Sequence, residues 1–331
     1  MESGRIRIVD IADELGLSTA TVSNVIHGKT KKISDETVKR VQQLLEERQY
    51  IPSMAGILLA QNDSKIIGVV INDHEKYEGH TLEDPFISAS VNALAKEIGQ
   101  AGKFLMLKVT DKWEEIPRFA SMWNMEGMVL SGYCEQDYKK LREQMHIPFV
   151  VYDGYMESSG NLVNIEVDHF DGGVQAGRYL KSRGHSAVLC ISDNNICMDR
   201  ERFMGLKSEI PNAELMVVPM EQEARAIFYR EHLGNIKNYS AVFAMSDYYA
   251  MDFIQFLKSA GVFVPEDISV VGFDDVRGSE KFVKQDNRQR AALAVNLLNQ
   301  LRNGDCGDKN MKLPVTLIER DSVCDVKMHK K

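Results

Sequence analysis

The sequence predicts a small all-α headpiece joined by a short linker to a larger α/β core with two lobes. Residues 8–26 form two short helical patterns separated by a glycine, which is the pattern of a helix-turn-helix. From Lys65 onward, apolar strand-like runs alternate with helical stretches over about 250 residues, as in parallel sheets. We place the headpiece at residues 1–52, the linker at 53–63 and the core at 64–331, with lobes near 64–163 and 164–288 followed by C-terminal crossovers.

The first two headpiece helices have distinct apolar and polar faces. In the first helix, Ile8, Ile11, Ala12 and Leu15 recur at helical spacing and form a buried stripe. Gly16 can adopt the left-handed conformation that ends this helix, and Ser18 is a good N-cap for the next. The second helix buries Val22, Val25 and Ile26. Its outward face is short and polar enough to enter a major groove, with Thr19, Ala20, Thr21, Ser23 and Asn24.

A third helix begins after Ser34, a second N-cap, and we expect it to end at residues 50–52 because a proline disfavours helix in the residue before it. Residues 53–60 are apolar but too few to form a stable helix alone. We therefore expect the linker to fold only when docked against DNA or a second copy of the chain.

The core contains seven buried strand runs with helices between them. The expected strands are 66–71, 104–109, 127–130, 149–152, 187–191, 241–244 and 268–273, and the expected helices include 88–101, 174–182 and 249–260. In such parallel sheets, ligands bind beyond the carboxyl ends of the strands, often between lobes. No glycine-rich dinucleotide or phosphate loop follows any of these strands.

Composition and charge narrow the function further. The net charge is −8, yet residues 1–60 are neutral and the remainder carries the whole negative balance. Lys29, Lys31 and Lys32 follow the second helix, where phosphates would run, so we expect modest non-specific DNA affinity. The N-terminus has no apolar secretion signal, which predicts a cytoplasmic protein. The five cysteines and eight histidines show no metal-ligand spacing, so we expect neither a metal nor a cofactor.

Specific motifs in both parts resemble the lactose-repressor (LacI/GalR) family of bacterial transcription regulators over essentially the whole chain. In the headpiece these are Asp10-Ile11-Ala12, Leu17-Ser18, Thr21-Val22-Ser23, Ile33-Ser34, Thr37 and Tyr50-Ile51-Pro52. In the core they are Asp168, Gly172-Gly173, Leu180, Gly184-His185, Glu201-Arg202, Gly205, Ser246-Asp247, Ala250, Gly261 and residues 264–275. The resemblance implies a core of the periplasmic-binding-protein type I fold with an effector in the cleft.

The resemblance also implies a homodimer whose two recognition helices read an approximately palindromic DNA operator. By position, Thr19, Ala20 and Asn24 would face base edges, and Asn24 can bond adenine bidentately. The phosphate contacts would come from Ser18, Thr21, Ser23, Ser34 and Thr37, with Arg7, His27 and Lys32 as further DNA-contacting residues. Leu59 occupies the position of a leucine that the family inserts into the minor groove.

For the effector, the resemblance implies ligand positions in both lobes. They are Asp84, Phe86, Tyr133, Asp153, Arg202, Ser246 and Asp274. Arg202, Asp153 and Asp274 supply charged planar groups that satisfy sugar hydroxyls, and Phe86 supplies an aromatic face for the ring. The sequence thus favours a sequence-specific repressor that releases its operator when a sugar binds.

Two features depart from the family, and other functions stay open. The segment between Asp275 and Gln285 is shorter than usual, and no leucine-heptad tail follows Arg320, which favours a dimer over a tetramer. An alternative is a corepressor-dependent regulator that responds to a purine, a phosphorylated metabolite or a partner phosphoprotein. An enzyme is disfavoured because no nucleophile–base pair, metal set or cofactor loop is visible, and a transport protein because no secretion signal is present.

Overall fold

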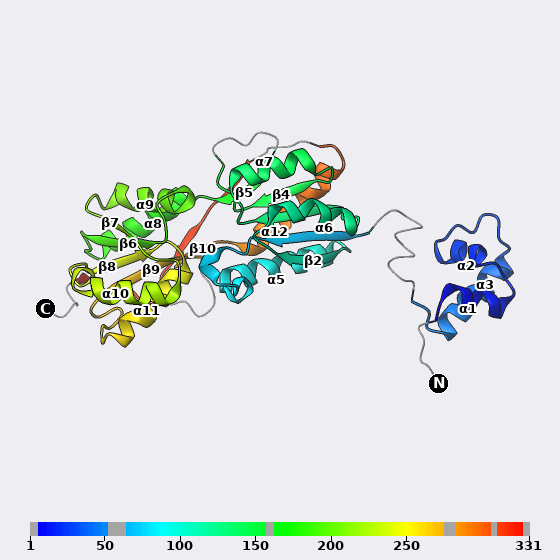
Figure 1. Cartoon of the computed structure of the whole chain (residues 1–331), viewed down its shortest axis with the longest axis horizontal. Helices are drawn as coiled ribbons and strands as arrows, with labels where there is room; N and C mark the ends of the chain where they lie inside the picture. Colours follow the sequence, from blue (N-terminus) through cyan, green and yellow to red (C-terminus); the bar gives the residue numbers. More distant parts are fainter. Residues whose placement is uncertain (1–5, 52–63, 157–161, 275–281, 306–309, 327–331) are drawn as a thin grey trace. The chain divides into compact units, whose positions relative to one another are not determined.

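The computed structural model describes residues 6–51, 64–156, 162–274, 282–305 and 310–326 (Figure 1). It forms two compact units, Met1–Ser64 and Lys65–Lys331. The linker 53–63, with its expected minor-groove residue Leu59, lies outside the described residues. Within the described ranges, no helix combines the length and apolar character needed to span a bilayer.

The headpiece is a three-helix cluster, as predicted. Its helices are α1 (Ile8–Leu15), α2 (Thr19–Ile26) and α3 (Asp35–Glu47). Gly16 ends α1 at φ 65°, in the left-handed conformation expected of it. Each helix contributes to one small core, built around Ile11, Ala12, Val22, Val25, Val41 and Leu44. Because this core is small, the headpiece has a correspondingly small hydrophobic contribution to stability.

The end of α3 corrects the sequence prediction. The helix stops at Glu47, several residues before the proline that was expected to end it. Gln49 takes a positive φ of 49°, and the Tyr50 N–H returns to the Leu45 carbonyl at 2.9 Å. The Arg48 guanidinium bonds the Glu14 carboxylate at 2.7 Å and so ties this end of α3 to α1. A left-handed turn therefore ends the helix before the constraint of Pro52 is reached.

The first lobe of the core contains a six-stranded sheet in the order β11-β5-β4-β3-β1-β2, and all the pairings between these strands are parallel. Its strands are β1 (Ile66–Ile71), β2 (Phe104–Val109), β3 (Gly127–Ser131), β4 (Phe149–Tyr152), β5 (Val163–Val167) and β11 (Asn310–Leu313). Its helical elements are η1 (Glu75–Tyr77), η2 (Thr81–Glu83), α5 (Pro85–Gln100), η3 (Trp113–Glu115), α6 (Ile116–Met122), α7 (Glu135–Gln144) and α12 (Asn287–Arg302).

Both faces of this sheet are covered, which explains why β1 is apolar at every position. Ile67, Val69 and Ile71 pack with residues of α5 and α12, whereas Ile66 and Val70 pack with residues of α6 and α7. Successive side chains of a strand point to opposite faces, so a strand buried on both sides reads as a continuous apolar run.

The second lobe is a similar sheet in the order β12-β10-β9-β8-β6-β7, in which β12 pairs antiparallel with β10 and the other pairings are parallel. Its strands are β6 (Val188–Ser192), β7 (Glu214–Val217), β8 (Ala241–Ala244), β9 (Ser269–Asp274), β10 (Phe282–Lys284) and β12 (Thr316–Ile318). Its helices are α8 (His169–Ser182), α9 (Cys197–Glu209), α10 (Gln222–Ile236) and α11 (Asp247–Ser259). Val188 and Cys190 face the α8–α9 side, and Leu189 and Ile191 face the α10–α11 side.

The chain crosses between the lobes three times. It leaves the first sheet after β5, returns between β10 and α12, and crosses again between β11 and β12. Figure 1 shows the orange helix α12 among the blue, cyan and green elements of the first lobe. The first crossing follows Val167, a few residues beyond the expected boundary at 163, because β5 pairs with β4 in the first sheet.

Helices α8 and α9 approach each other with their backbones almost in contact. A Cβ atom built on Gly173 of α8 would overlap the Arg202 carbonyl oxygen of α9, and one built on Gly205 would overlap the Phe170 carbonyl oxygen. Only glycine permits such an approach at these positions. The close approach brings His169, at the start of α8, beside the Arg202 side chain of α9.

Candidate functional site

The headpiece presents a polar surface on α2. Thr19, Ala20 and Asn24, the three residues expected at base edges, are all exposed. Ser18 caps α2 by accepting the Thr21 N–H at 3.1 Å, and the two hydroxyl oxygens lie 2.9 Å apart. The helix N-cap therefore fixes the position of the exposed residues that follow it.

The residues expected near phosphates lie around this helix and the start of α3. Ser34 caps α3 in the same way as Ser18 caps α2, with 2.8 Å between the Ser34 and Thr37 hydroxyl oxygens. Ser23 is half-buried on α2, as is His27 at its C-cap, whereas Lys32 is exposed in the loop before α3. The Arg7 guanidinium lies 3.2 Å from the Asp10 carboxylate, so in this unit its charge is directed at α1.

The core contains a cavity of about 480 Å³ between its lobes. The structure brings all seven predicted effector positions to its wall: Asp84, Phe86, Tyr133, Asp153, Arg202, Ser246 and Asp274. Several lie at or just beyond the carboxyl ends of parallel strands, including Asp153 after β4 and Asp274 at the end of β9. This is the place where open α/β sheets bind ligands.

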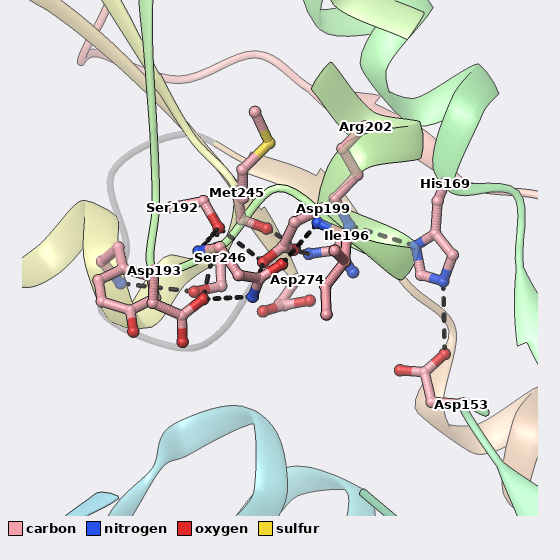
Figure 2. Close-up of polar contacts among 12 residues, drawn as sticks. Asp153, His169, Ser192, Asp193, Ile196, Asp199, Arg202, Met245, Ser246 and Asp274 are labelled. Carbon is pink, nitrogen blue, oxygen red and sulfur yellow. Dashed lines mark hydrogen bonds and ion pairs between the residues drawn. The ribbon is translucent and has the colours of Figure 1, made fainter. Parts of the chain in front are cut away.

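Arg202 is the most constrained of these residues. It is 5% exposed, and its guanidinium carbon lies 3.7 Å from the centre of the Phe273 ring. Its Nε donates to His169 Nδ1 at 3.2 Å, and Nη1 donates to the Met245 carbonyl oxygen (Figure 2). A guanidinium held in this way presents its remaining donors in a fixed direction, as recognition of a ligand requires.

Asp274 is a buried carboxyl group held in an unusual backbone conformation. It has a φ of 122° and is 7% exposed. Its Oδ1 accepts a hydrogen bond from Gln285 Nε2 at 2.7 Å. Burial raises the pKa of Asp274 to about 7, although the positive charge of Arg202 acts in the opposite direction. A strained, partly neutralised carboxyl group on a cavity wall is typical of a binding site.

Asp153 occupies the corresponding position in the first lobe, with a φ of 63°. Its Oδ1 lies 3.2 Å from Arg290 Nη2 and 3.8 Å from His169 Nε2. Burial lowers the pKa of His169 well below its ordinary value, so the ring is neutral and accepts at Nδ1 from Arg202. Arg290 itself is fully buried, with its guanidinium carbon 4.2 Å from the centre of the Tyr152 ring.

These contacts form a connected set that we call the hinge network. Its members are Asp153, His169, Arg202, Asp274, Gln285 and Arg290. Gln285 links the two ends, because it donates to Asp274 and accepts from Arg290 Nη1 at 2.7 Å. Gln285 lies between β10 and α12 and His169 directly follows β5, so two of the three interlobe crossings contribute to it. The cavity wall is thereby connected to the segments that join the two lobes.

Three predicted residues commit polar atoms to their own lobe. Asp84 caps α5 by accepting the Ile87 N–H at 2.8 Å, and burial raises its pKa. Ser246 is the N-cap of α11, and the Tyr133 hydroxyl donates to the Thr110 carbonyl oxygen at 2.5 Å. These residues shape the cavity wall and leave fewer hydrogen-bonding positions for a ligand. Phe86 lies above the Arg290 guanidinium, 5.6 Å from ring centre to carbon.

Sequence reasoning missed several polar residues of the wall. Lys76 lies on η1, and Asp193 and Asp199 lie beyond β6. Burial by itself lowers the pKa of Lys76, but the Tyr77 phenol and these two carboxylates act more strongly together and raise the pKa above its ordinary value. The Asp199 carboxylate accepts from the Ser192 hydroxyl at 2.7 Å, and burial raises its pKa (Figure 2). A signal for Asp193 existed, because it directly follows a predicted buried strand.

The charge of the wall is negative on balance. Its described aspartates are Asp84, Asp137, Asp153, Asp193, Asp199 and Asp274, and its described lysine and arginine residues are Lys76 and Arg202. His74 also lines the cavity, but burial lowers its pKa and favours the neutral ring. In the ranges that the structure describes, no group of three or more His, Cys, Asp or Glu side chains has a geometry that could hold a metal ion.

Comparisons with known proteins agree with this architecture. Residues 7–53 match the family model for bacterial regulatory proteins of the lacI family, and residues 178–323 match that for periplasmic binding protein-like domains. The HTH-type transcriptional repressor PurR of Erwinia tasmaniensis is 29% identical over 343 residues, with 96% of this chain and 97% of that protein covered.

Solved structures give the same result for the fold. A structure of the lac repressor dimer bound to operator and the anti-inducer ONPF has a TM-score of 0.80 at 22% identity, covering 97% of this chain and all of that chain. A complex of the transcriptional regulator CelR with cellobiose has a TM-score of 0.67 at 20% identity, covering 96% of this chain and all of that chain.

A helix-turn-helix headpiece followed by a two-lobed domain with an interlobe cavity defines a DNA-binding transcriptional regulator with an effector domain. The headpiece matches the lacI family of bacterial regulatory proteins, the core matches periplasmic binding protein-like domains, and the chain as a whole is similar to the transcriptional repressor PurR. The family resemblance predicted from the sequence is thus confirmed.

Proposed function

We propose that this protein is a homodimeric repressor that binds a palindromic operator and releases it when a neutral sugar occupies the interlobe cavity. The observation that carries the effector half of the proposal is the wall of the cavity, where carboxylates outnumber cations around the fixed guanidinium of Arg202. The named relatives support the DNA half, since PurR is a transcriptional repressor and the lac repressor structure is a dimer on operator DNA. Such a protein acts in the cytoplasm, where bacterial operators lie.

The exposed face of α2 supplies the DNA-reading chemistry. Asn24 carries an amide that can pair with adenine N6 and N7, and Ala20 offers only a methyl group, which suits a thymine methyl. We assign phosphate contacts to the hydroxyl pairs Ser18–Thr21 and Ser34–Thr37 and to Lys32. Arg7, Ser23 and His27 complete the proposed interface, with Leu59 of the linker as the minor-groove wedge.

The charge of the cavity favours a neutral ligand over a phosphorylated one. A phosphate group would enter a wall on which six aspartates face two permanent cations, and Arg202 is already bonded to His169 and Met245. Sugar hydroxyls, in contrast, donate hydrogen bonds to carboxylates and accept them from a guanidinium. Phe86 and Tyr133 add aromatic surface for the C–H face of a sugar ring.

A purine is the second candidate effector, because the PurR relative is 29% identical over almost the whole chain. A neutral purine meets no charge barrier in this cavity, but it presents far fewer donors than a sugar to the carboxylates of the wall. We therefore rank a sugar first, with induction as the sign of regulation, and a purine corepressor second.

The hinge network supplies a route for regulation. Asp153 and Asp274 lie on opposite lobes and are joined through Arg290 of α12 and Gln285 of the crossing segment before it. A ligand that bonds both aspartates binds best at one lobe separation and therefore shifts the population toward it. Operator release follows if that arrangement moves the two headpieces away from their half-site spacing.

We propose a binding protein without catalytic activity. Two of the nucleophilic side chains that line the described cavity have structural partners: Ser246 caps α11, and the Cys134 thiol donates to Asp137 Oδ2 at 3.0 Å. His169 is neutral but accepts from Arg202, so it is committed to the hinge network.

A thermal-shift scan of the full chain tests the effector. The panel contains neutral mono- and disaccharides, sugar phosphates and nucleobases. A specific ligand at a hundred times its Kd adds about 2.7 kcal/mol of stability. We expect a neutral sugar to raise the Tm of the wild type and of Arg200→Ala, an exposed neighbour on α9, and to have no effect on Arg202→Ala. A shift only with purines supports the corepressor, and a shift only with sugar phosphates contradicts the charge argument.

Binding of operator DNA tests the headpiece assignment. Asn24→Ala should reduce discrimination at one base pair by about 1–3 kcal/mol, whereas Lys32→Ala should weaken binding evenly across sequences. Fluorescence anisotropy on the operator and its single-base variants, at fixed salt, separates the two patterns. Equal and small effects of both substitutions would contradict the placement of α2 in the major groove.

A further inference from the structure

The core has a second cavity, of about 490 Å³, which we call the outer cavity. Elements of both lobes line it: His80 and Glu83 from the η1–η2 region of the first lobe, and Gln222, Met251 and Gln255 from α10 and α11 of the second. The Gln222 N–H donates to Glu78 Oε1 at 2.7 Å, so the lobes touch at its wall. No residue predicted from the sequence, apart from Asp84, belongs to it.

The outer cavity adjoins the effector cavity. Tyr77, Asp84 and Tyr248 line both. The Tyr77 and Tyr248 rings meet edge to face, with 5.7 Å between their centres and 80° between their planes. The Tyr248 hydroxyl donates to the Lys76 carbonyl oxygen across the lobes at 2.9 Å. The boundary between the outer cavity and the effector cavity is therefore formed by the side chains of Tyr77, Asp84 and Tyr248.

Buried contacts hold Tyr248 in this position. The guanidinium carbon of Arg225 lies 5.4 Å from the centre of the Tyr248 ring, and Arg225 itself is only 1% exposed. Arg225 Nε donates to Asp252 Oδ2 at 2.7 Å, and Nη1 donates to the Pro219 carbonyl oxygen at 3.1 Å. Burying an arginine is costly unless its donors are satisfied, as they are here. The boundary tyrosine is thus firmly positioned by the second lobe.

The chemistry of the outer cavity suits a neutral polyhydroxyl group. Its wall combines amides (Gln222 and Gln255), carboxyl groups (Glu78, Glu83, Asp84 and Asp252) and an imidazole (His80) with the apolar side chain of Met251 and the two tyrosine rings. The donors of Arg225, the described cation of the wall, are already used by Asp252 and by backbone carbonyls. Planar polar groups beside aromatic surface are what a sugar ring requires.

We propose that the outer cavity is a second carbohydrate subsite, so that the effector is a disaccharide or longer saccharide that extends from the effector cavity past Tyr77 and Tyr248. This inference rests on the proposed function, because it assumes a sugar in the effector cavity. The saccharide bridges both lobes twice, once at Asp153 and Asp274 and once at the outer cavity. It therefore gains affinity from a closed arrangement that a monosaccharide contacts only in part.

Isothermal titration calorimetry on the full chain tests the proposal. The probes are glucose, galactose, xylose and ribose, and the disaccharides cellobiose, maltose, lactose and xylobiose. Met251→Trp adds bulk at the wall of the outer cavity, at a side chain that is 38% exposed and tolerates change. Gln255→Trp, one helical turn further along α11 and also exposed, is the second variant. Met204→Trp, at an exposed methionine of α9 that lines neither cavity, is the matched control.

We expect one disaccharide to bind at least tenfold more tightly than its component monosaccharide. Met251→Trp or Gln255→Trp should weaken the disaccharide at least tenfold and leave the monosaccharide within twofold, and the control should change neither. Equal affinity for both sugars, or an equal loss of both in the variants, overturns the subsite while the proposed function stands. Absence of binding to every sugar overturns the proposed function, and the subsite with it.

Discussion

Replacing Asp274 with asparagine should stabilise the protein at pH 8 while removing most of its affinity for the effector. The carboxyl group is 7% exposed, and burial raises its pKa to about 7 from an ordinary value of 3.8. At pH 8 the folded protein must therefore hold a charge that the unfolded chain solvates freely. Asparagine keeps an oxygen that can accept from Gln285 Nε2 and carries no charge to bury.

The magnitude follows from linkage. A raised carboxyl pKa means that the unfolded state releases its proton first, so the free energy of unfolding falls as the pH rises from about 4 to about 7 and is level above. The difference between the pKa of Asp274 in the folded protein and its ordinary value corresponds to a free-energy cost of folding of about 4 kcal/mol at most. Arg202 loses a nearby negative charge in the variant, so the gain is smaller than this maximum. We expect the free energy of unfolding at pH 8 to rise by roughly 1–3 kcal/mol, which corresponds to a Tm rise of roughly 3–10 °C.

Differential scanning calorimetry of wild type and Asp274→Asn at pH 5 and pH 8 measures the effect. The gain in Tm should be larger at pH 8 than at pH 5, and calorimetric titration should show a loss of about 10–100-fold in effector affinity, the usual contribution of a hydrogen bond to a charged group. A variant less stable than wild type at pH 8, or a Tm difference that does not change with pH, would refute the reasoning.

Two further substitutions test the packing behind the site. Arg290→Met should destabilise the core by about 3–5 kcal/mol, because it leaves the Asp153 carboxylate without its buried cation. Urea unfolding measures this loss of stability. A change under about 1 kcal/mol would contradict the pairing of Arg290 with Asp153. Gly173→Ala should destabilise the protein by several kcal/mol, because the new Cβ overlaps the Arg202 carbonyl oxygen. Gly99→Ala, on the open face of α5, should stabilise the protein by about 0.5–1 kcal/mol. Similar Tm shifts for the two variants would contradict the close contact between α8 and α9.

The headpiece shows how far a local pattern can be trusted. The two N-caps, the left-handed Gly16 and the buried faces of the first two helices were predicted from the sequence and are present. These features depend on neighbours within a few residues, which the sequence displays directly. The end of α3 was wrong because a left-handed residue, Gln49, acted before Pro52 could, and glutamine gives no signal of that conformation.

In the core, most buried strands were predictable and most edge elements were not. Strands β1, β4 and β8 have the predicted bounds, because burial on both faces makes them continuously apolar. Strand β2 also has the predicted bounds, although it lies at the edge of its sheet and is partly exposed. The buried strand β5 was missed, because Asn164 and Glu166 interrupt its apolar residues. Strand β7 was missed: it lies at the edge of its sheet, and its residues are partly exposed, so its composition carries little signal. Strands β10 to β12 are short and belong to crossings whose partners lie far away in the chain.

The candidate site also has features that the sequence predicted and features that only the tertiary structure shows. The sequence by itself, through its match to family positions, indicated seven residues that meet at the interlobe cavity. Only the tertiary structure decided their chemical state. Arg202 is fixed by His169 from another helix, and Asp274 is bonded by Gln285 from a crossing segment. The outer cavity likewise exists only because α10 and α11 pack opposite η1 and η2. Burial, pKa and cavity shape depend on groups brought together from distant parts of the chain, and no local pattern encodes them.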